Sequence, residues 1–468
     1  MINDILRRIP KTDVLLAGSA LAEAAEKYPH ALIKSVTTAY LAELRSAALS
    51  GLISEIPSVP VIEEKIKSRL DGGDYYSLKR VVNATGVVLH TNLGRAPLGE
   101  AVAEHVANVA RSYCNLEYDL AEGKRGSRYT HVEQLLCRLT GAEAAMVVNN
   151  NAAAVFLMLN TLAKGKKTAV SRGELVEIGG SFRVPEIMRE SGAELVEIGT
   201  TNKTHPYDYQ RAIEDGAEVL LKVHTSNFVM SGFTESVEVS ELRKIADKNG
   251  AVVLYDLGGG FMFTKEALGV KEGYAVFQCL RDGADIVCFS GDKLLGSSQC
   301  GILIGKKEYI EKIKKNQLTR MLRIDKLSLA TLEATLQYCV DISLAKEKIP
   351  VIRMLSMDKG ECLAISQKLK ARINASAPSC YTELVPVIDE AGGGSLPGVV
   401  FEGYGVSAAI PGVDVIKAEK LLRRRTVPII ARMIKGALVF SARTLNDGDV
   451  DEIATALKEI SEEAGGRA

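Results

Sequence analysis

One lysine, Lys293, lies in a setting that suits covalent chemistry. The run Ile286–Phe289 is apolar and typical of a buried strand, and a second apolar run, Gly301–Ile304, follows a turn that contains glycine. A lysine on a tight loop between buried strands is shielded from water, which lowers the pKa of its ammonium group and frees an amine for Schiff-base chemistry. A surface lysine in an ordinary turn is the alternative for this pattern alone.

An aspartate ends the preceding predicted strand. The apolar run 251–255 leads to Asp256, and the glycines 258–260 follow it. Pyridoxal phosphate (PLP) enzymes need a lysine that carries the cofactor and a carboxylate that keeps the pyridine nitrogen protonated. Alone, Asp256 is as easily explained as a turn cap. Together the two residues predict PLP chemistry, with Ser290 as a candidate ligand of the cofactor phosphate.

A third candidate segment opens a helix. The predicted strand 144–148 is followed by Asn149, Asn150, Asn151 and three alanines that begin with Ala152. Small residues at a helix start leave backbone N–H groups free at the positive end of the helix dipole, which favours phosphate binding. Asparagine is also a common helix N-cap, so a purely structural role is the alternative.

The elements that position these residues alternate along the chain. Predicted strands at 144–148, 168–170, 194–198, 219–223 and 251–256 are separated by predicted helices. This pattern predicts an α/β fold whose mostly parallel sheet carries ligand-binding residues at the carboxyl ends of its strands. His224 follows one of these strands and is a candidate cofactor residue. Thr200 and Thr201 follow another.

Three arginines are candidates for anion binding. Arg95 lies between Gly94 and Ala96 in a loop that is rich in polar residues, and Arg320 and Arg323 share a face if their segment is helical. A guanidinium group can bind an oxyanion through two parallel hydrogen bonds. Surface arginines without a ligand are the alternative.

Composition limits the class of protein. The chain has 468 residues, 58 Lys plus Arg and 58 Asp plus Glu, so its net charge of zero gives no indication of DNA or RNA binding. Eight scattered cysteines without a metal-ligand spacing indicate reduced thiols in a cytoplasmic protein and no metal site. No membrane span and no secretory signal is apparent, so a membrane partner is not expected.

The length predicts more than one domain. We expect an N-terminal helical domain at 1–75, a large domain at 76–340 and a small C-terminal α/β domain at 341–468. The expected details are helices at Leu15–Lys27, Ala31–Ser50, Val61–Leu70 and Lys326–Leu344, a linker at Asp71–Asp74 and a flexible connector at Gly392–Pro397.

Several segments together resemble the bacterial L-seryl-tRNA(Sec) selenium transferases, or selenocysteine synthases, of the fold-type-I PLP superfamily. They are Asn83–Leu98, Gly123–Arg128, Asn149–Ala154, Tyr255–Gly260 and Phe289–Gly301. The motif Ser-Gly-Asp-Lys-Leu-Leu-Gly around Lys293 is specific. The chain departs from the family just afterwards, with Ser297-Ser298-Gln299 where Gly-Pro-Gln is expected.

The resemblance implies a reaction and a set of residue roles. Serine on a selenocysteine tRNA is dehydrated to a dehydroalanyl group, which then receives selenium from selenophosphate. Lys293 and Asp256 correspond to the PLP lysine and the pyridine partner. The resemblance further implies donor binding by Arg95, Arg320 and Arg323, a site lined by Asp292, Thr200 and Thr201, tRNA binding by the N-terminal domain, and a homodecamer.

Two other functions compete with this one. Relatives that act on small amino acids or amino sugar acids by α,β-elimination share the PLP chemistry without tRNA. They generally lack the N-terminal helical segment, so residues 1–75 favour the tRNA enzyme. A PLP-binding or scaffold protein without catalysis is disfavoured by the combination of Lys293, Asp256 and the three arginines.

Overall fold

The computed structural model describes residues 2–51, 53–73, 75–180 and 182–465. The chain divides into two compact units. The larger unit contains Val87–Lys359 and Ile388–Glu402, and the smaller unit contains Met1–Gly86, Gly360–Val387 and Gly403–Ala468. Asp74, the last residue of the expected linker, lies outside the described residues. The division into three domains stays a prediction.

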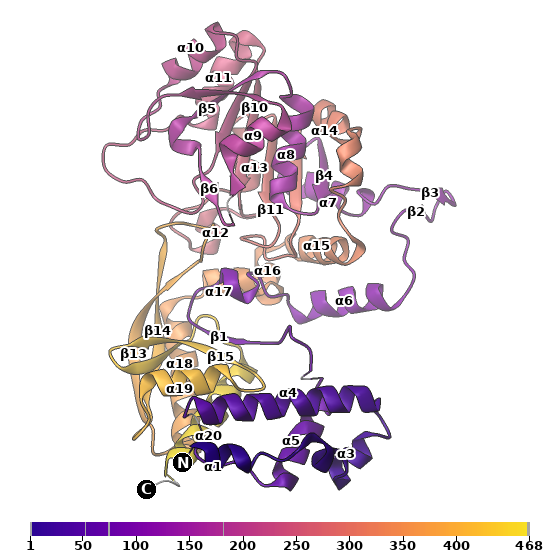
Figure 1. Ribbon diagram of the computed structural model, residues 1–468. Coiled ribbons are helices and arrows are strands. Elements are labelled where there is room, and N and C mark those ends of the chain that lie inside the picture. Colours follow the sequence, from indigo (N-terminus) through magenta and orange to yellow (C-terminus); the bar gives the residue numbers. More distant parts are fainter. Residues whose placement is uncertain (1, 52, 74, 181, 466–468) are drawn as a thin grey trace. The chain divides into compact units, whose positions relative to one another are not determined.

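The larger unit is built on a seven-stranded sheet in the order β4-β12-β11-β10-β9-β5-β8 (Figure 1). β12 is antiparallel to both of its neighbours, and the other pairings are parallel. The mostly parallel α/β sheet is therefore confirmed. The strands are β4 (Ala144–Val148), β5 (Lys167–Ser171), β8 (Glu194–Ile198), β9 (Val219–Val223), β10 (Val252–Gly258), β11 (Ile286–Ser290) and β12 (Gly301–Gly305).

Helices cover both faces of this sheet. Alternate residues of β10 enter different cores, with Leu254 on the face that α8 covers and Val253 and Tyr255 on the other. The helices are α6 (Glu100–Arg111), α7 (Thr130–Thr140), α8 (Asn151–Leu162), α9 (Val184–Ser191), α10 (Pro206–Glu214), α11 (Val239–Asn249), α12 (Lys265–Leu268), α13 (Val276–Arg281), α14 (Lys307–Lys314), α15 (Lys326–Tyr338), α16 (Ile342–Lys348) and α17 (Pro350–Ser356). Burial on both faces explains why inner strands such as β11 and β12 consist mostly of apolar residues.

Short elements complete the larger unit. Two small hairpins pair β2 (Tyr118–Asp119) with β3 (Lys124–Arg125) and β6 (Glu177–Ile178) with β7 (Phe182–Arg183). The described loops also contain the 3₁₀ turns η1 (Thr91–Leu93), η2 (Arg172–Glu174) and η3 (Gln317–Arg320).

The smaller unit has a five-stranded sheet in the order β1-β15-β16-β14-β13. Its first strand pairs in parallel with β15, although the two are far apart in the sequence. The elements are β1 (Val82–Ala84), α18 (Lys359–Ser376), β13 (Tyr381–Glu390), β14 (Val400–Ala409), α19 (Val415–Arg423), β15 (Ile429–Ile434), β16 (Ala437–Ser441) and α20 (Asp447–Gly465).

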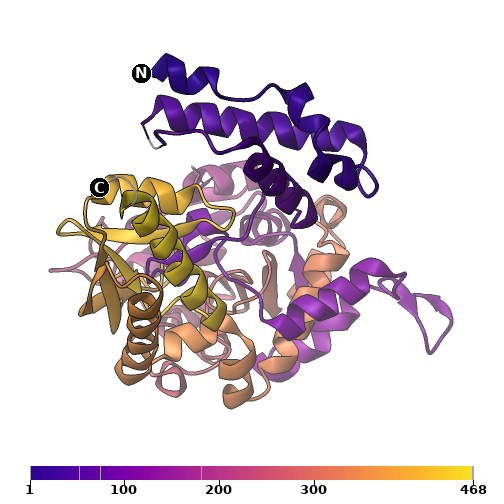
Figure 2. The same ribbon diagram turned by 90° about the horizontal axis from the view of Figure 1, so that it is seen from below.

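The N-terminal segment consists of helices with a core of their own. Leu15, Ile33, Ile62 and Ile66 are buried together. Figure 2 shows α4 in indigo as a long helix with shorter helices beside it. The helices are α1 (Ile2–Arg7), α2 (Thr12–Leu16), α3 (Ser19–Ala24), α4 (His30–Leu49) and α5 (Val59–Asp71).

Two expected helices are interrupted in the structure. The helix predicted over 15–27 breaks before α3, because Gly18 is extended and a Cβ there would lie 2.0 Å from the Glu63 carboxylate. The helix predicted over 326–344 ends at Tyr338, and Asp341 starts α16 by accepting a hydrogen bond from the backbone N–H of Leu344 at 2.9 Å. A side-chain cap therefore begins a new helix inside a continuous helical pattern.

The segment 392–397, which the sequence predicts to be a flexible connector, is closely packed in the structure. Ser395 and Leu396 are buried, and Gly392 approaches the Leu89 carbonyl so closely that a Cβ would lie 2.6 Å from its oxygen. The segment is a tightly packed loop of the larger unit. Glycine is needed at Gly392 because its φ of 111° is left-handed in sign and the neighbouring backbone leaves no space.

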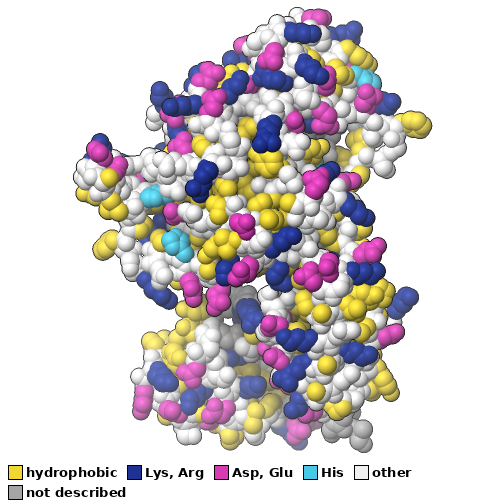
Figure 3. All heavy atoms as spheres, turned by 180° about the vertical axis from the view of Figure 1, so that it is seen from behind, with side chains coloured by type: hydrophobic (Ala, Val, Ile, Leu, Met, Phe, Trp, Pro, Cys, Tyr) yellow, Lys and Arg dark blue, Asp and Glu magenta, His cyan; other side chains and the backbone are white. Residues whose placement is uncertain are grey.

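Charges are mixed on the surface. On the face shown in Figure 3, Lys and Arg side chains lie among Asp and Glu side chains. This distribution agrees with the net charge of zero. Among the described helices, none combines the length and the apolar character that crossing a membrane requires.

Candidate active site

Lys293 lies on the turn between β11 and β12, which are the third and second strands from the β4 edge of the sheet. Backbone hydrogen bonds fix this turn: the Gly296 N–H donates to the Lys293 carbonyl at 2.9 Å, and the Ser297 N–H donates to the Gly291 carbonyl at 2.9 Å. Lys293 is only 5% exposed. Two glycines make room for it, since a Cβ on Gly259 would lie 3.3 Å from its Cδ and one on Gly394 would lie 3.3 Å from its Nζ.

This environment lowers the pKa of the Lys293 ammonium group. Burial is the main cause and the charge of Arg95 is the second, while Asp256 and Asp292 act in the opposite direction. A lowered pKa increases the fraction of neutral amine, which is the nucleophilic form. The buried setting that the sequence predicted for Lys293 is thus present.

Asp256 lies near the carboxyl end of β10 and is 2% exposed. Its Oδ1 accepts hydrogen bonds from Asn151 Nδ2 at 2.9 Å and from the Gly258 N–H at 3.1 Å, and the Cys288 thiol lies 3.7 Å away. Burial raises the pKa of this carboxyl, and the Asn151 hydrogen bond and the Lys293 charge oppose the rise. A cation placed next to Asp256 would favour its ionised form.

The two asparagines at the start of α8, Asn150 and Asn151, have different roles. Asn150 is the N-cap, because its side chain accepts a hydrogen bond from the Ala153 N–H at 2.8 Å. Asn151 turns to Asp256, and Ala152 is exposed at the first turn. The structural role considered for Asn150 is therefore present. Phosphate binding by this helix start stays a prediction.

His224 follows β9, and its ring lies edge-on to Tyr274 with centroids 5.4 Å apart. Burial lowers the pKa of His224 to about 4, with further contributions from the charges of Lys222 and Lys293. The imidazole is consequently neutral at physiological pH. It can offer one donor and one acceptor to a ligand without adding charge.

Arg95 and Asp292 form an ion pair beside Lys293. Arg95 Nη1 lies 2.8 Å from Asp292 Oδ2; Asp292 is buried and Arg95 is partly buried. Arg95 has a φ of 60°, which is uncommon for a residue with a side chain. Such conformations are often retained at functional sites. The structure therefore brings one of the three predicted arginines next to the lysine turn.

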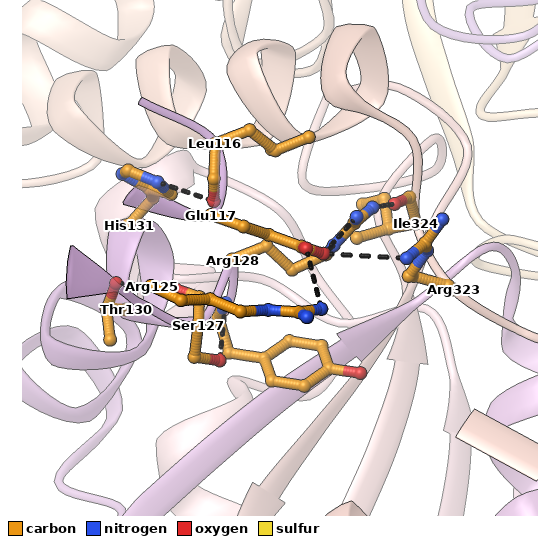
Figure 4. A network of polar contacts seen from close by, with 10 residues as sticks. Leu116, Glu117, Arg125, Ser127, Arg128, Thr130, His131, Arg323 and Ile324 are labelled. Atoms are coloured by element: carbon orange, nitrogen blue, oxygen red, sulfur yellow. Dashed lines mark hydrogen bonds and ion pairs between the residues drawn. The ribbon is translucent and has the colours of Figure 1, made fainter. Parts of the chain in front are cut away.

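Arg323 belongs to another network, which Figure 4 shows from close by. Its Nη1 lies 3.5 Å from Glu117 Oε1, and Arg128 Nε donates to the same oxygen at 3.0 Å. Arg128 also bonds to the Ile324 carbonyl. These contacts tie the loop after η3 to the segment before β2. Arg320 lies exposed in η3, and among the described residues no hydrogen bond or ion pair joins either arginine to Lys293.

A cavity of about 520 Å³ adjoins the site. Thr201 and His224 line it, whereas Lys293 does not. Thr200 supports the loop behind it, since its hydroxyl donates to the Lys203 carbonyl at 3.0 Å. Of the predicted pair, Thr201 therefore faces open space and Thr200 stabilises a turn.

The residues around Lys293 fit PLP. The side-chain oxygens of Ser226, Ser395 and Asn151 are buried without a hydrogen-bond partner among the described residues. A Cβ on Gly258 would lie 3.4 Å from Ser226 Oγ, and a Cβ on Gly259 would lie 3.8 Å from Ser395 Oγ and 3.4 Å from Lys293 Cβ. Buried polar atoms without partners are costly, so a polar ligand here would satisfy them. Ser290 is buried at the end of β11, and its contact with the phosphate stays a prediction.

Three residues near the site were not predicted from the sequence. Ser226 and Ser395 lie in loops that are remote in sequence from the lysine motif, and Cys288 was expected only to be a buried thiol. The alternation of residues along β11 could have placed Cys288 on the same face as Asp256, because the two residues are directly paired across the strands. No sequence signal identified the two serines.

Comparison with known proteins gives two family matches. A family model described as L-seryl-tRNA selenium transferase matches residues 81–446, and one described as selenocysteine synthase N terminal matches residues 6–45. A protein of Caldanaerobacter subterraneus subsp. tengcongensis named L-seryl-tRNA(Sec) selenium transferase is 44% identical over 98% of this chain and 99% of its own length. One of Geotalea daltonii with the same name is 42% identical over 98% and 99%.

Among solved structures, D-glucosaminate-6-phosphate ammonia-lyase is similar with a TM-score of 0.57 and 19% identity. The similarity covers 85% of this chain and 98% of that one. At this identity the likeness concerns the fold. It bears out the expected fold-type-I architecture.

Proposed function

Because the chain belongs to the L-seryl-tRNA selenium transferase family, we propose that it converts L-seryl-tRNA(Sec) to L-selenocysteinyl-tRNA(Sec) with selenophosphate as selenium donor. The observation that carries the proposal is the buried pair of Lys293 and Asp256 in a chain similar to these enzymes over nearly its whole length. PLP is the cofactor. When bound, it withdraws electrons from the substrate Cα, so that the β-hydroxyl group can leave.

The chain's own residues have defined tasks in this reaction. Lys293 would hold the cofactor, and its amine would serve as the base for the Cα proton, because its lowered pKa favours the neutral form. Asp256 would keep the pyridine nitrogen protonated, and Asn151 fixes the orientation of that carboxylate. His224, Ser290 and the start of α8 at Asn150–Ala152 would contact the cofactor.

The donor is an anion, and its proposed binding site includes Arg95, Arg320, Arg323, Thr200 and Thr201. Arg95 is supported by its position beside the lysine turn, where Asp292 holds its guanidinium group. The charge of a phosphoryl group requires such cations when water is excluded. Donor binding by Arg320 and Arg323 rests on the family resemblance, since Arg323 contacts Glu117 in the described chain.

The proposal extends to partners and organisation. We assign tRNA binding to residues 1–75, with 76–340 as the catalytic domain and 341–468 as the small domain. The separate core of the N-terminal helices supports the first assignment. A homodecamer in the cytoplasm is the state that the resemblance implies. Recognition of RNA by shape through a few contacts is compatible with the mixed surface charge.

The direct test incubates the PLP-loaded protein with serylated selenocysteine tRNA and selenophosphate, followed by analysis of the esterified amino acid. Selenocysteine is the expected product. Serine recovered unchanged under conditions in which Lys293 carries PLP would refute the proposal.

The eliminating lyase without tRNA is the second enzyme class considered. The match of residues 6–45 to the selenocysteine synthase N-terminal family supports the tRNA enzyme over this lyase. Free serine or an amino sugar acid, offered in place of seryl-tRNA, should therefore not be consumed at a comparable rate.

A further inference from the structure

The cavity beside His224 has the walls of a nucleoside site. Its size, about 520 Å³, lies within the range of small-molecule pockets. Two aromatic residues that are each 38% exposed, Phe228 and Tyr274, line it, and Leu396 adds apolar surface. Partly exposed aromatic rings next to polar groups are the surfaces on which unpaired bases stack.

This cavity lies next to the reactive lysine. Two residues after Gly394, whose Cβ position is 3.3 Å from Lys293 Nζ, the chain reaches Leu396 in the cavity wall. On the other side, Tyr255 lines the cavity and precedes Asp256 in β10. The cavity therefore opens from the same strand ends that carry the site.

The proposed substrate has a geometric requirement that such a cavity meets. The seryl group is esterified to the terminal ribose of the tRNA, so only a few covalent bonds separate its amino nitrogen from the sugar. When that nitrogen is at Lys293, the terminal nucleoside must occupy space immediately beside the lysine.

The charged residues of the cavity suit the phosphodiester group that links the terminal nucleoside to the rest of the tRNA. Lys203 and Lys265 line it, and neither forms an ion pair with a residue in the described ranges. Of the three lining carboxylates, Glu174 lies 3.0 Å from Lys222 Nζ and Glu235 lies 3.1 Å from His205 Nδ1, so that among the described residues only Glu272 has no ion-pair partner. The unengaged cations are thus available to a phosphodiester.

We propose that this cavity binds the 3′-terminal nucleoside of the aminoacyl-tRNA, with its base against Phe228 and its phosphate near Lys203 and Lys265. The inference rests on the proposed function and adds a subsite to it. The nucleoside contributes binding energy that free serine lacks, so the cavity also separates the tRNA-bound substrate from the free amino acid.

The test uses a stable amide, 3′-deoxy-3′-(L-serylamino)adenosine, and L-serinamide as the matched ligand without a nucleoside. Calorimetric titration of the PLP-loaded protein should give about tenfold or more tighter binding of the adenosine amide, the order expected from one base stacked on an aromatic ring. Phe228→Ala should abolish most of this preference and leave serinamide binding unchanged. Phe233→Ala is the control, because Phe233 is 89% exposed and does not line the cavity.

A second pair of variants tests the phosphate contact. Lys203→Gln and Lys265→Gln should weaken binding of full-length seryl-tRNA and reduce its dependence on salt, while binding of the adenosine amide is retained. Unchanged salt dependence would overturn this part.

The outcomes separate the inference from the function. If the wild-type protein forms selenocysteinyl-tRNA but binds both amides equally, or if Phe228→Ala and Phe233→Ala weaken the adenosine amide alike, the nucleoside site is wrong and the function stands. If no selenocysteinyl-tRNA forms, the proposed function fails whichever amide binds better.

Discussion

At the scale of single residues, the site depends on buried polar side chains, some of which lack hydrogen-bond partners among the described residues. Lys293 and Asp256 are each shifted by burial away from the charged form. The lowered pKa of Lys293 favours reaction of its amine with a carbonyl group, and the raised pKa of Asp256 favours binding of a cation beside its carboxylate. The pair is thus preorganised for its cofactor rather than for stability of the free protein.

The first prediction concerns Lys293. Reduction of the PLP-loaded protein with borohydride should fix the cofactor on the peptide that contains Lys293, and Lys293→Ala should carry no covalently attached cofactor. Peptide mapping by mass spectrometry provides the measurement. A label on any other lysine would contradict the assignment.

The second prediction concerns Arg95. Replacing it by alanine removes charged hydrogen bonds worth roughly 1.5–3 kcal/mol each, so selenium incorporation should fall on the order of tenfold or more. Dehydration of the seryl group precedes donor attack and should be spared. Both steps are measured separately, without and with donor. Arg183→Ala, at an exposed arginine paired with Glu177, is the control, and equal loss of both steps would exclude a donor role for Arg95.

The third prediction uses the pKa of His224, which is about 4 in the folded chain against an ordinary 6.5. Between these values the unfolded chain binds a proton that the folded chain does not, so acidification from pH 7 towards pH 4 lowers stability through this residue by roughly 1.4 kcal/mol per pH unit once below pH 6.5. In cofactor-free protein, His224→Asn should lose less thermal stability between pH 7 and pH 5 than the wild type. Parallel losses would show that His224 is not kept neutral by its surroundings.

At the scale of elements, the strands of the central sheet could be predicted from the sequence, whereas the breaks within helices and the long-range contacts could not. Strands such as β4, β8 and β9 are apolar or half-apolar runs between turn residues, and their predicted bounds coincide with the observed ones. Where a predicted helix is interrupted, a single local contact accounts for the break, such as the close approach of the Glu63 carboxylate to Gly18. The ion pair of Arg323 with Glu117 joins residues far apart in the sequence, which no local pattern reveals.

The fourth prediction concerns the contact between β12 and α8. A Cβ on Gly301 would lie 2.1 Å from the Asn150 carbonyl oxygen and 2.9 Å from the Ala154 Cβ. Gly301→Ala should therefore push the start of α8 away, lowering stability by about 1–3 kcal/mol and weakening cofactor binding. Gly179→Ala is the matched control, since a Cβ there meets nothing within 4 Å. Thermal unfolding and titration with PLP measure both effects, and a Gly301→Ala protein as stable as the control would refute the tight contact.

At the scale of the whole molecule, the N-terminal helices carry a core that contains only their own residues. A chain that begins at residue 76 should accordingly keep bound PLP and lose productive use of seryl-tRNA. The cofactor absorption and the affinity for tRNA are the two measurements. Unchanged tRNA affinity would assign the segment to assembly or to a cap instead.

The parallel pairing of β1 with β15 has a consequence for biosynthesis. The ribosome makes Val82–Ala84 early, but the strand that receives it, Ile429–Ile434, emerges only near the end of translation. The Lys293 turn likewise waits for the 392–397 loop. The nascent chain therefore carries an unpaired strand and an incomplete cofactor site until synthesis is almost complete. During this period the exposed segments are prone to aggregation, and chaperones can bind them.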